Sequence, residues 1–352
     1  QHAFLYSNGV MTDLGTLVGG TNSYSAAINA SGQVTGTATT VGNATPHAFR
    51  YSNGVMTDLG TLGGSFSYGQ AIKAAGQITG RSYTPGIQEH AFRYSNGGMT
   101  DLHTLGGTES SGVAINDSGQ VTGSSRTIGN FEQHAFLYSG GSMLDLGTLG
   151  GSTSYGQAIN ASGQVTGGAN LEYNWYQHAF RYDNGVMTDL GTLGGSDSIG
   201  TAINASGQVT GRSYIAGNAQ QHAFVTNGNV MTDLGTLGGN YSTGTAINAS
   251  GQVVGSAYTA GSALHAFLYS GGQMLDLNNL VDPSTPLGLY WVLTEGIAIT
   301  DTGYILANGV NTQTGHTHAF LLFAPVPLPA AAWLLLSGLA GLGIIRRRRT
   351  AA

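Results

Sequence analysis

Apolar residues in this chain come in short runs separated by tight turns, and the same order of runs recurs along most of its length. Residues 47–80 read HAFRYSNGVMTDLGTLGGSFSYGQAIKAAGQITG and contain two pairs of such runs. In the first pair, HAFRY and VMTDL flank Ser52, Asn53 and Gly54, and Asn-Gly between apolar segments is a strong hairpin signal. In the second pair, AIK and QITG flank residues 74–76, where other copies read AINASGQVTG and suit an Asx-type turn that closes on a left-handed glycine. The pattern predicts four short strands per copy.

Copies of this unit fill residues 2–323. They begin at His2, His47, His90, His134, His178, His222 and His265, with a partial copy at His318. Four strands in about 44 residues match the blade of a β-propeller, whereas leucine-rich and β-helical solenoids use shorter repeats. We therefore expect an all-β domain over residues 1–323, a β-propeller of about seven four-stranded blades, with a solenoid or split sandwich as the alternative. Helix is not expected in the repeats, because Gly or Pro interrupts every window long enough to form one.

The order of the runs also predicts how the blades are divided. A small-residue inner strand ending in AIN would line the central channel, and six blades would run from about Ala27 to Leu277. The seventh would begin at Ile297 and take its outer strands, HAFLY and VMTDL, from the amino terminus, so that no edge stays open. HAFLLF at 318–323 competes for that place. Either the first strand is displaced or residues that precede Gln1 are missing, and since the chain opens directly on a repeat we expect a processed product or a fragment.

The seventh unit departs from the others. Pro283 and Pro286 interrupt it, and a bulky run follows at residues 289–292. This insertion either caps the ring or covers its channel, or else it belongs to a closing blade that is repacked around different side chains.

Charge is sparse and unevenly placed. Asp, Glu, Lys and Arg make up 8% of the chain, and 58 residues are glycine, as turns and tight sheet packing require. Of the 11 basic residues four form the C-terminal arginine run, which leaves seven against 17 acidic ones in the repeats. Nucleic acid is a poor partner for such a surface. The chain has no cysteine, which excludes disulfides and thiolate metal sites.

Residues 324–352 form a second region of different character. No charge occurs from Ala324 to Ile345, and an apolar segment leads into Arg346, Arg347, Arg348 and Arg349. About 20 apolar residues in a helix cross the hydrocarbon of a bilayer, and the arginines would hold that end on the cytoplasmic side. We expect a C-terminal transmembrane helix that places the repeats outside the inner membrane, because an all-β ring has no place for a buried core helix of this kind.

Two resemblances follow from these features. The motif Val326, Pro327, Leu328, Pro329 and Ala330, the apolar segment and the basic tail together resemble the VPLPA variant of the PEP-CTERM sorting signals of Gram-negative bacteria. That resemblance implies an exosortase-type processing enzyme as partner, a temporary inner-membrane anchor and release to the cell exterior, often in species that make exopolysaccharide. Residues 2–323 resemble the HAF extracellular repeat family, which implies no activity.

Histidine and aspartate recur in step in every repeat, and such a pair could supply a base or a metal ligand. A catalytic group is needed once, however, whereas a polar residue in every blade more simply satisfies a buried hydrogen bond. We interpret the pairs as structural and expect no catalytic, metal-binding or cofactor-binding residues among them. The pairs are His2 with Asp13, His47 with Asp58, His90 with Asp101, His134 with Asp145, His178 with Asp189, His222 with Asp233, and His265 with Asp276.

The turns at Asn116, Asp117 and Ser118 and their copies resemble calcium loops only faintly, because they lack the several carboxylates that hard cations need. Residues that occur once are better candidates for a ligand site, and an aromatic and carboxylate set could stack on and hydrogen-bond a sugar. The alternative is that these residues only vary the loop sequences and bind no ligand. The candidate contacts are Glu172, Trp175, Tyr176 and Trp291, to which His103, Asp282, Glu295 and His316 can be added.

The sequence therefore predicts an exported, non-enzymatic propeller without a cofactor. It would bind glycan or exopolysaccharide, or serve as a structural protein, at the cell surface or in the matrix of a Gram-negative bacterium. The rival hypothesis is a secreted propeller enzyme, a hydrolase or lyase acting on polysaccharide. It requires two carboxyl groups from different blades within about 10 Å at one mouth of the channel. A purely structural filler is the third hypothesis, and it predicts no ligand.

Overall fold

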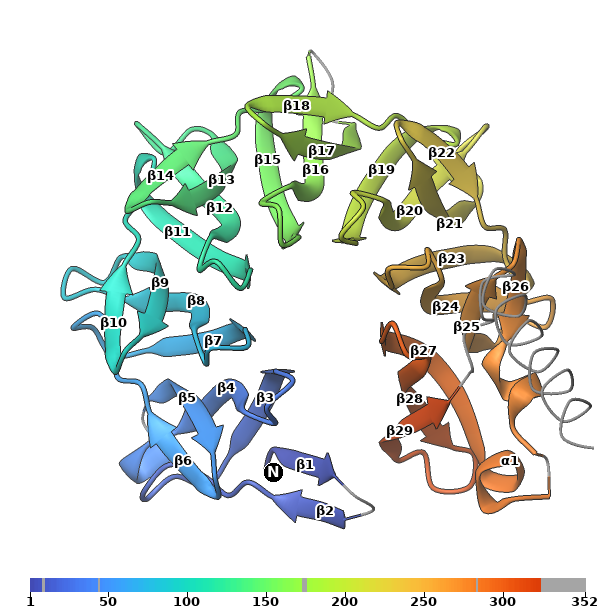
Figure 1. Cartoon of the computed structure of the whole chain (residues 1–352), viewed down its shortest axis with the longest axis horizontal. Coiled ribbons are helices and arrows are strands. Elements are labelled where there is room, and N and C mark those ends of the chain that lie inside the picture. The colour runs from blue at the N-terminus through green and yellow to red at the C-terminus, as the bar shows by residue number, and fades with distance from the viewer. Residues whose placement is uncertain (8–9, 44, 173–175, 283, 324–352) are drawn as a thin grey trace, which may run out of the picture.

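The computed structural model describes residues 1–7, 10–43, 45–172, 176–282 and 284–323. Strands dominate the described chain and are arranged as consecutive antiparallel units around a central opening (Figure 1). The expected all-β class and the four short strands of each repeat are confirmed.

The units follow one another along the chain. The first hairpin consists of β1 (Phe4–Ser7) and β2 (Val10–Asp13). Three four-stranded units follow: β3 (Ser23–Ile28), β4 (Val34–Thr39), β5 (Pro46–Ser52) and β6 (Val55–Asp58), with a 3-10 turn η1 (Val41–Asn43) between β4 and β5; β7 (Ser67–Ile72), β8 (Ile78–Tyr83), β9 (Glu89–Ser95) and β10 (Gly98–Asp101); β11 (Gly106–Ile115), β12 (Val121–Thr127), β13 (Gln133–Ser139) and β14 (Ser142–Asp145). Three more are β15 (Gly150–Ile159), β16 (Val165–Leu171), β17 (Gln177–Asp183) and β18 (Val186–Asp189); β19 (Gly194–Ile203), β20 (Val209–Ile215), β21 (Gln221–Asn227) and β22 (Val230–Asp233); β23 (Gly238–Ile247), β24 (Val253–Thr259), β25 (Leu264–Ser270) and β26 (Gln273–Asp276). A three-stranded unit ends the described chain, with β27 (Trp291–Ile299), β28 (Tyr304–Asn311) and β29 (Thr317–Phe323).

Hydrogen bonding groups these strands into sheets of unequal size, which corrects the prediction of seven separate four-stranded blades. Two sheets have four strands and two have eight, and the remaining sheets have three and two. Each eight-stranded sheet consists of two neighbouring units, one pair of them linked by a single parallel bridge between Gln133 and Thr153 and the other by a bridge between Gln221 and Tyr241. Within these larger sheets, each unit keeps its own four-stranded antiparallel meander.

The predicted closure of the ring is wrong. β1 and β2 pair only with each other, and β29 pairs only with β28. HAFLLF occupies the third-strand position of the last unit, so that HAFLY is displaced from it. Figure 1 shows the β1–β2 hairpin and the β27–β29 unit as separate sheets at the two ends of the ring.

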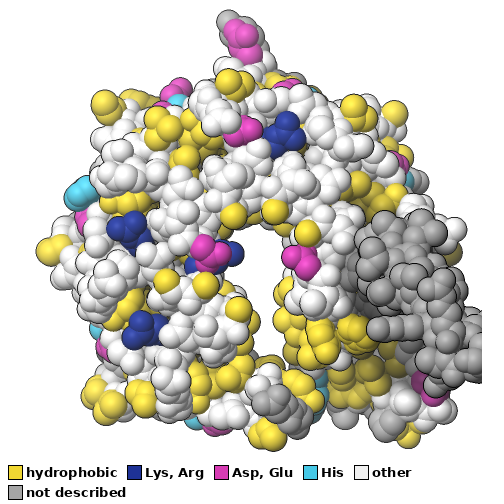
Figure 2. Space-filling view, in the orientation of Figure 1, with side chains coloured by type: hydrophobic (Ala, Val, Ile, Leu, Met, Phe, Trp, Pro, Cys, Tyr) yellow, Lys and Arg dark blue, Asp and Glu magenta, His cyan; other side chains and the backbone are white. Residues whose placement is uncertain are grey.

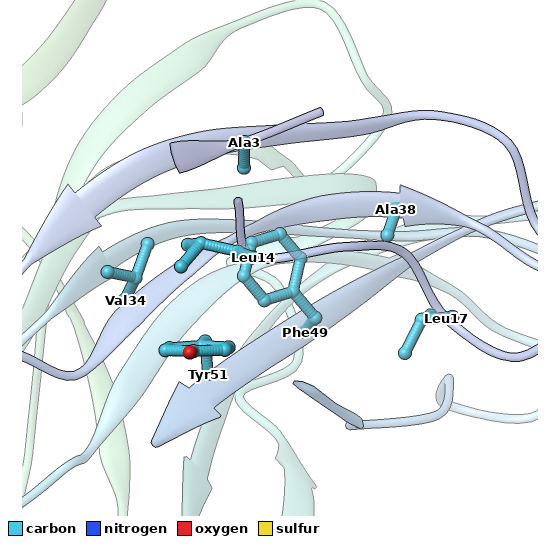
Figure 3. Packing of buried hydrophobic residues seen from close by; sticks show 7 residues of the cluster. All are labelled: Ala3, Leu14, Leu17, Val34, Ala38, Phe49 and Tyr51. Carbon is cyan, nitrogen blue, oxygen red and sulfur yellow. The ribbon is translucent and has the colours of Figure 1, made fainter. Parts of the chain in front are cut away.

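The displaced hairpin is held by the first unit instead. Ala3, Leu14 and Leu17 pack against Phe49 and Tyr51 and two further residues of that unit in one buried cluster (Figure 3). This arrangement repeats around the ring, because each buried cluster combines the outer strands of one unit with the strands of the next. The hairpin therefore occupies the place that the outer strands of a preceding blade would take.

Close contact between neighbouring units depends on a glycine in the inner strand. A Cβ atom at Gly156 would clash with the Thr122 hydroxyl of the preceding unit, and one at Gly200 would clash with Thr166. The threonines are fully buried and donate to phenylalanine carbonyls of their own HAF strands. Glycine lets the backbones of adjacent units approach each other at these points.

The tips of the inner hairpins surround the central opening, as was expected for the AIN segments (Figure 1). The space-filling view shows that the centre of the ring is open and that apolar side chains line part of its rim (Figure 2).

The insertion in the seventh unit contains the short helix α1 (Pro286–Tyr290), which corrects the expectation that helix is absent from the repeats. The Thr285 hydroxyl accepts a hydrogen bond from the Gly288 N–H, and the helix begins at Pro286, a favoured position for proline. It follows a 3-10 turn η2 (Leu277–Leu280) and packs against β27, away from the opening (Figure 1). The insertion therefore belongs to a repacked closing unit and does not cap the channel.

The predicted transmembrane helix and the arginine run lie outside the described residues, as does the VPLPA motif. Within the part of the chain that is described, no helix has the length and apolar character needed to cross a bilayer.

Candidate functional site

The structure brings every repeated histidine and aspartate into contact. The HAF strand and the following MTDL strand are hydrogen-bonded neighbours, which places the two side chains on the same side of the hairpin. In all seven pairs the histidine Nδ1 lies 2.6 to 2.9 Å from the nearer carboxylate oxygen. The prediction from spacing alone thus identified seven real contacts, among them His47 with Asp58, His134 with Asp145 and His178 with Asp189.

Each carboxylate also fixes the turn that follows it. Asp58 accepts the N–H of Gly60 at 2.8 Å, and Asp189 accepts that of Gly191 at 2.7 Å. Partial burial raises the pKa of Asp189, but the hydrogen bonds from His178 and from the Gly191 N–H together outweigh it and hold the pKa below its usual value. A carboxylate engaged in this way holds the hairpin together, which supports the structural interpretation of the pairs.

The asparagine of the AIN segment carries a contact between units that sequence reasoning missed. Asn160 Oδ1 accepts the N–H groups of Ser162 and Gln164, which forms the predicted Asx-type turn. Its Nδ2 donates to the backbone carbonyl of Asn204 in the next unit at 3.0 Å. The same hydrogen bond, from the side-chain amide to a backbone carbonyl of the next unit, is donated by Asn29, Asn116, Asn204 and Asn248. We call these inter-unit bonds the asparagine clasps.

One unit breaks this pattern. Lys73 occupies the position at which the other four-stranded units have asparagine, and its side chain has no amide to donate to the following unit. Asp117 of that following unit makes a different inter-unit contact: its carboxylate accepts the N–H of Ala74 at 3.1 Å, as that of Asp301 accepts the N–H of Ala249. Asp117 therefore serves the interface between units. Asn116 Oδ1 accepts the N–H groups of Ser118 and Gln120 and thereby holds the turn itself.

The residues that occur once are dispersed. Glu172 and Tyr176 flank the tip of the β16–β17 loop, and Trp175 between them lies outside the described residues. Trp291 belongs to β27, three units further along the ring, so that the predicted contacts are not brought together. Asp282 accepts the backbone N–H and the hydroxyl of Ser284 within the insertion.

Trp291 packs against the other strands of its own sheet. Its ring lies 4.5 Å from the ring of His318 and 5.1 Å from that of Phe320, measured between centroids. A cavity of about 160 Å³ lies beside it, lined by Trp291, His265 and Asn278 together with apolar residues of the insertion. This volume is below the roughly 300 Å³ at which ligand pockets for drug-sized molecules begin.

Glu295 and His316, the other residues that occur once, lie in and beside the last sheet. Glu295 is 3.4 Å from the Asn308 amide of the neighbouring strand β28, and His316 precedes β29, where its carbonyl accepts the N–H of Asn311 at 2.8 Å. His103 differs from these because it contacts other titratable side chains. Its Nδ1 lies 3.4 Å from Asp101, which also binds His90.

Comparison with solved structures gives the fold its name. The chain is similar to the β-propeller domain of the Trilobed protease from Pyrococcus furiosus, described as having an open velcro topology, with a TM-score of 0.50 at 11% identity over 79% of this chain and 87% of that one. The protein has a β-propeller fold. TolB from Acinetobacter baumannii gives a TM-score of 0.39 at 13% identity, covering 71% of this chain and 64% of that one. The sequence matches no family model and no curated protein.

Proposed function

We propose that this protein is an exported, non-enzymatic propeller that binds glycan or exopolysaccharide at the cell surface or in the extracellular matrix. The loops between the second and third strands of the units are the binding elements of this proposal. They are the segments in which the repeats differ most, and variable loops on a rigid scaffold are where binding diversifies.

The observation that carries the proposal is the exposure of apolar and aromatic side chains on these equivalent loops. The exposed fraction is 85% for Ile87, 82% for Ile128, 90% for Phe131 and 46% for Tyr176. A single residue of this kind is ordinary on a protein surface. Their recurrence on the same loop of successive units arranges several weak contact points around one rigid ring, which suits a long polymer bound through avidity.

The C-terminal region supports export. The VPLPA motif, apolar segment and arginine run of residues 326–349 keep the order of a sorting signal, and the proposal gives the helix the role of a temporary inner-membrane anchor. An exosortase-type enzyme would process the chain near Pro329. The low charge of the repeats and the absence of cysteine are compatible with an extracellular location.

A glycan array with the whole chain, run beside a turnover assay on every polysaccharide that binds, tests the binding role. We expect binding without depolymerisation. The double variant Phe131→Ala and Tyr176→Ala should weaken binding by roughly fivefold for each aromatic ring removed, because stacking of one ring on a sugar is worth about 1 kcal/mol. Val186→Ala is the control, since Val186 is 61% exposed but lies on the outer hairpin. Equal binding by the double variant would place the ligand elsewhere, and a chain that binds no glycan at all would leave the structural filler as the better hypothesis.

The export role has its own test. In a Gram-negative host that has an exosortase-type enzyme, the tagged chain should appear outside the cell in a shortened form. Pro327→Ala with Pro329→Ala should keep it full-length and membrane-associated, whereas Pro325→Ala, outside the motif, should not. Release of the double variant at the control's rate would contradict the assigned sorting role.

A polysaccharide-active enzyme is the second candidate, and one observation favours it. Glu89 is a half-buried carboxyl group, and burial raises its pKa, with the Glu109 charge of the next unit adding to the effect and Arg81 opposing it. A carboxyl group that stays protonated to higher pH can act as a general acid. The enzyme hypothesis predicts that the chain cleaves a polysaccharide and that Glu89→Gln abolishes this cleavage. If no bound polysaccharide is cleaved, this role is excluded.

A further inference from the structure

His103 stands at a position that glycine occupies in five other repeats. The equivalent residues Gly60, Gly147, Gly191 and Gly235 all have positive φ angles, and a Cβ atom would meet nothing within 4 Å at any of them. His103 has a φ of 62°, a left-handed conformation that costs a residue with a Cβ roughly 1 kcal/mol relative to glycine. The site is thus open enough for a histidine, but the fold itself has no need of one there.

The histidine completes a cluster that the other repeats lack. His90 Nδ1 lies 2.9 Å from Asp101 Oδ2, and His103 Nδ1 lies 3.4 Å from the same oxygen. The three ligand atoms lie within 4.8 Å of one another, and in the described part of the chain no other group of three histidine or acidic side chains meets this condition. The His103 N–H also donates to Asp101 Oδ1 at 2.7 Å, which fixes the orientation of the carboxylate.

Two imidazole nitrogens and one carboxylate oxygen form a donor set for zinc and neighbouring divalent transition metals, whereas calcium and magnesium prefer oxygen alone. Tetrahedral bonds of about 2.0 to 2.1 Å place neighbouring ligand atoms about 3.3 Å apart. The observed separations of 2.9 and 3.4 Å from the shared carboxylate oxygen bracket that value. The third separation, between the two histidine ligand atoms, is within 4.8 Å, and rotation of the exposed His103 side chain would bring it to the value that the site needs.

The exposure of the three side chains is graded. The exposed fraction is 13% for His90, 26% for Asp101 and 77% for His103. The two inner ligands are thus held by the hairpin, while the third lies at the surface and is free to adjust. An ion bound here would keep positions open to water or to an oxygen of an external ligand.

We propose that His90, Asp101 and His103 bind a divalent transition-metal ion, of which Zn²⁺ is the representative. The ion replaces the proton that His90 Nδ1 shares with the Asp101 carboxylate, and the His90 proton then resides on Nε2. The other repeats keep the bare histidine–aspartate pair and serve as internal controls. This proposal is independent of the glycan-binding role.

Calorimetric titration of the whole chain with ZnCl₂, supported by the visible absorption of bound Co²⁺, tests the proposal. The wild-type chain should bind one ion at this site, and His103→Gly should weaken that binding on the order of tenfold or more, since one of three ligands is removed. The variant restores the residue of the other repeats, so it should fold at least as stably without metal. Zn²⁺ should raise the melting temperature of the wild-type chain and not that of the variant.

A gain-of-site variant provides the matched control. Gly147 has a φ of 72° and open space around its Cβ position, and it follows the pair His134 and Asp145. Gly147→His should therefore add a second bound ion with Co²⁺ absorption like that of the first. The proposal is overturned if the wild-type chain binds no Zn²⁺, if His103→Gly binds it with unchanged affinity and stoichiometry, or if Gly147→His adds no ion.

Discussion

The asparagine clasp at Asn160 offers the sharpest test of how the units are joined. The residue is 6% exposed. Its side chain makes two bonds to the backbone N–H groups of Ser162 and Gln164, two bonds to the side chains of the same residues, and the inter-unit bond to Asn204. Asn160→Ala removes all five at once. It also leaves the N–H of Gln164 and the carbonyl of Asn204 with one partner fewer in a region where water has little access.

The magnitude follows from these hydrogen bonds. The three bonds with backbone groups, at a net contribution of about 1 kcal/mol each, give a decrease of about 3 kcal/mol in the free energy of unfolding. The side chains of Ser162 and Gln164 are not buried and can bond to water instead. A typical exposed substitution stays within about 0.5 kcal/mol. The expected decrease is thus large enough to separate a clasp from a surface asparagine.

The clasp is missing at Lys73, so the reverse substitution, which adds a clasp, can be made there. Lys73→Asn should restore a donor aimed at the carbonyl of Asn116 and stabilise the protein by about 1 kcal/mol. Lys73→Ala is the matched control, because it removes the lysine without adding an amide, and it should give no such gain. The bond between Ala74 and Asp117 stays in place in both variants.

Urea denaturation with tryptophan fluorescence measures the free energies, and hydrogen exchange locates the change. For Asn160→Ala, amide protection should fall at residues 160–164 and at the adjoining turn, 204–208, of the next unit. An effect confined to 160–164 would show that the turn matters and the inter-unit bond does not. Equal stability of Lys73→Asn and Lys73→Ala would refute the clasp argument.

Three further outcomes are expected. Gly156→Ala should cost about 2 kcal/mol in urea denaturation because its Cβ would clash with a buried threonine of the preceding unit, whereas Gly98→Ala, where a Cβ meets nothing within 4 Å, should be nearly neutral. The pKa values of Asp101 and Asp189 are lower in the folded chain than in the unfolded one, so their stabilisation is present at neutral pH and disappears as the pH falls below about 4; urea midpoints that stay constant from pH 6 to pH 3 would contradict this. Trp291→Ala should lower stability by roughly 2 to 3 kcal/mol because its ring is packed against its own sheet, and it should leave glycan binding unchanged; a selective decrease in binding would return Trp291 to the ligand site.

Local features of this fold could be read from the sequence because they depend on neighbours in the chain. Asn53 and Gly54 both adopt the positive φ angles that the hairpin prediction required. His47 and Asp58 are 11 residues apart, and the register of the intervening hairpin alone brings them together. Such contacts are fixed once the turn is known.

Contacts between units could not be read in the same way. The amide of Asn160 bonds a carbonyl 44 residues away, and the spacing of the repeats does not reveal which atoms of adjacent units meet. The sequence predicts a ligand contact at Trp291 because this residue occurs outside the repeat pattern, and the structure shows its ring packed against His318 and Phe320 of its own sheet. The signal for the proposed metal site was present in the sequence, since His103 replaces glycine, but only the structure shows its Nδ1 beside Asp101.

The position of the break in the ring also has a basis in these contacts. Asn248 is the last residue to make a clasp, and its amide bonds the carbonyl of Thr300 in the final unit. Thr300 replaces asparagine there and has no amide to offer a following unit. On the other side, the hydroxyl of Ser23 accepts the N–H of Ala3, so the first unit already has its outer-strand contact from the β1–β2 hairpin. The final unit thus lacks the amide donor and the first unit's serine is bonded to the amino-terminal hairpin, so neither of these two contacts joins the ends of the ring.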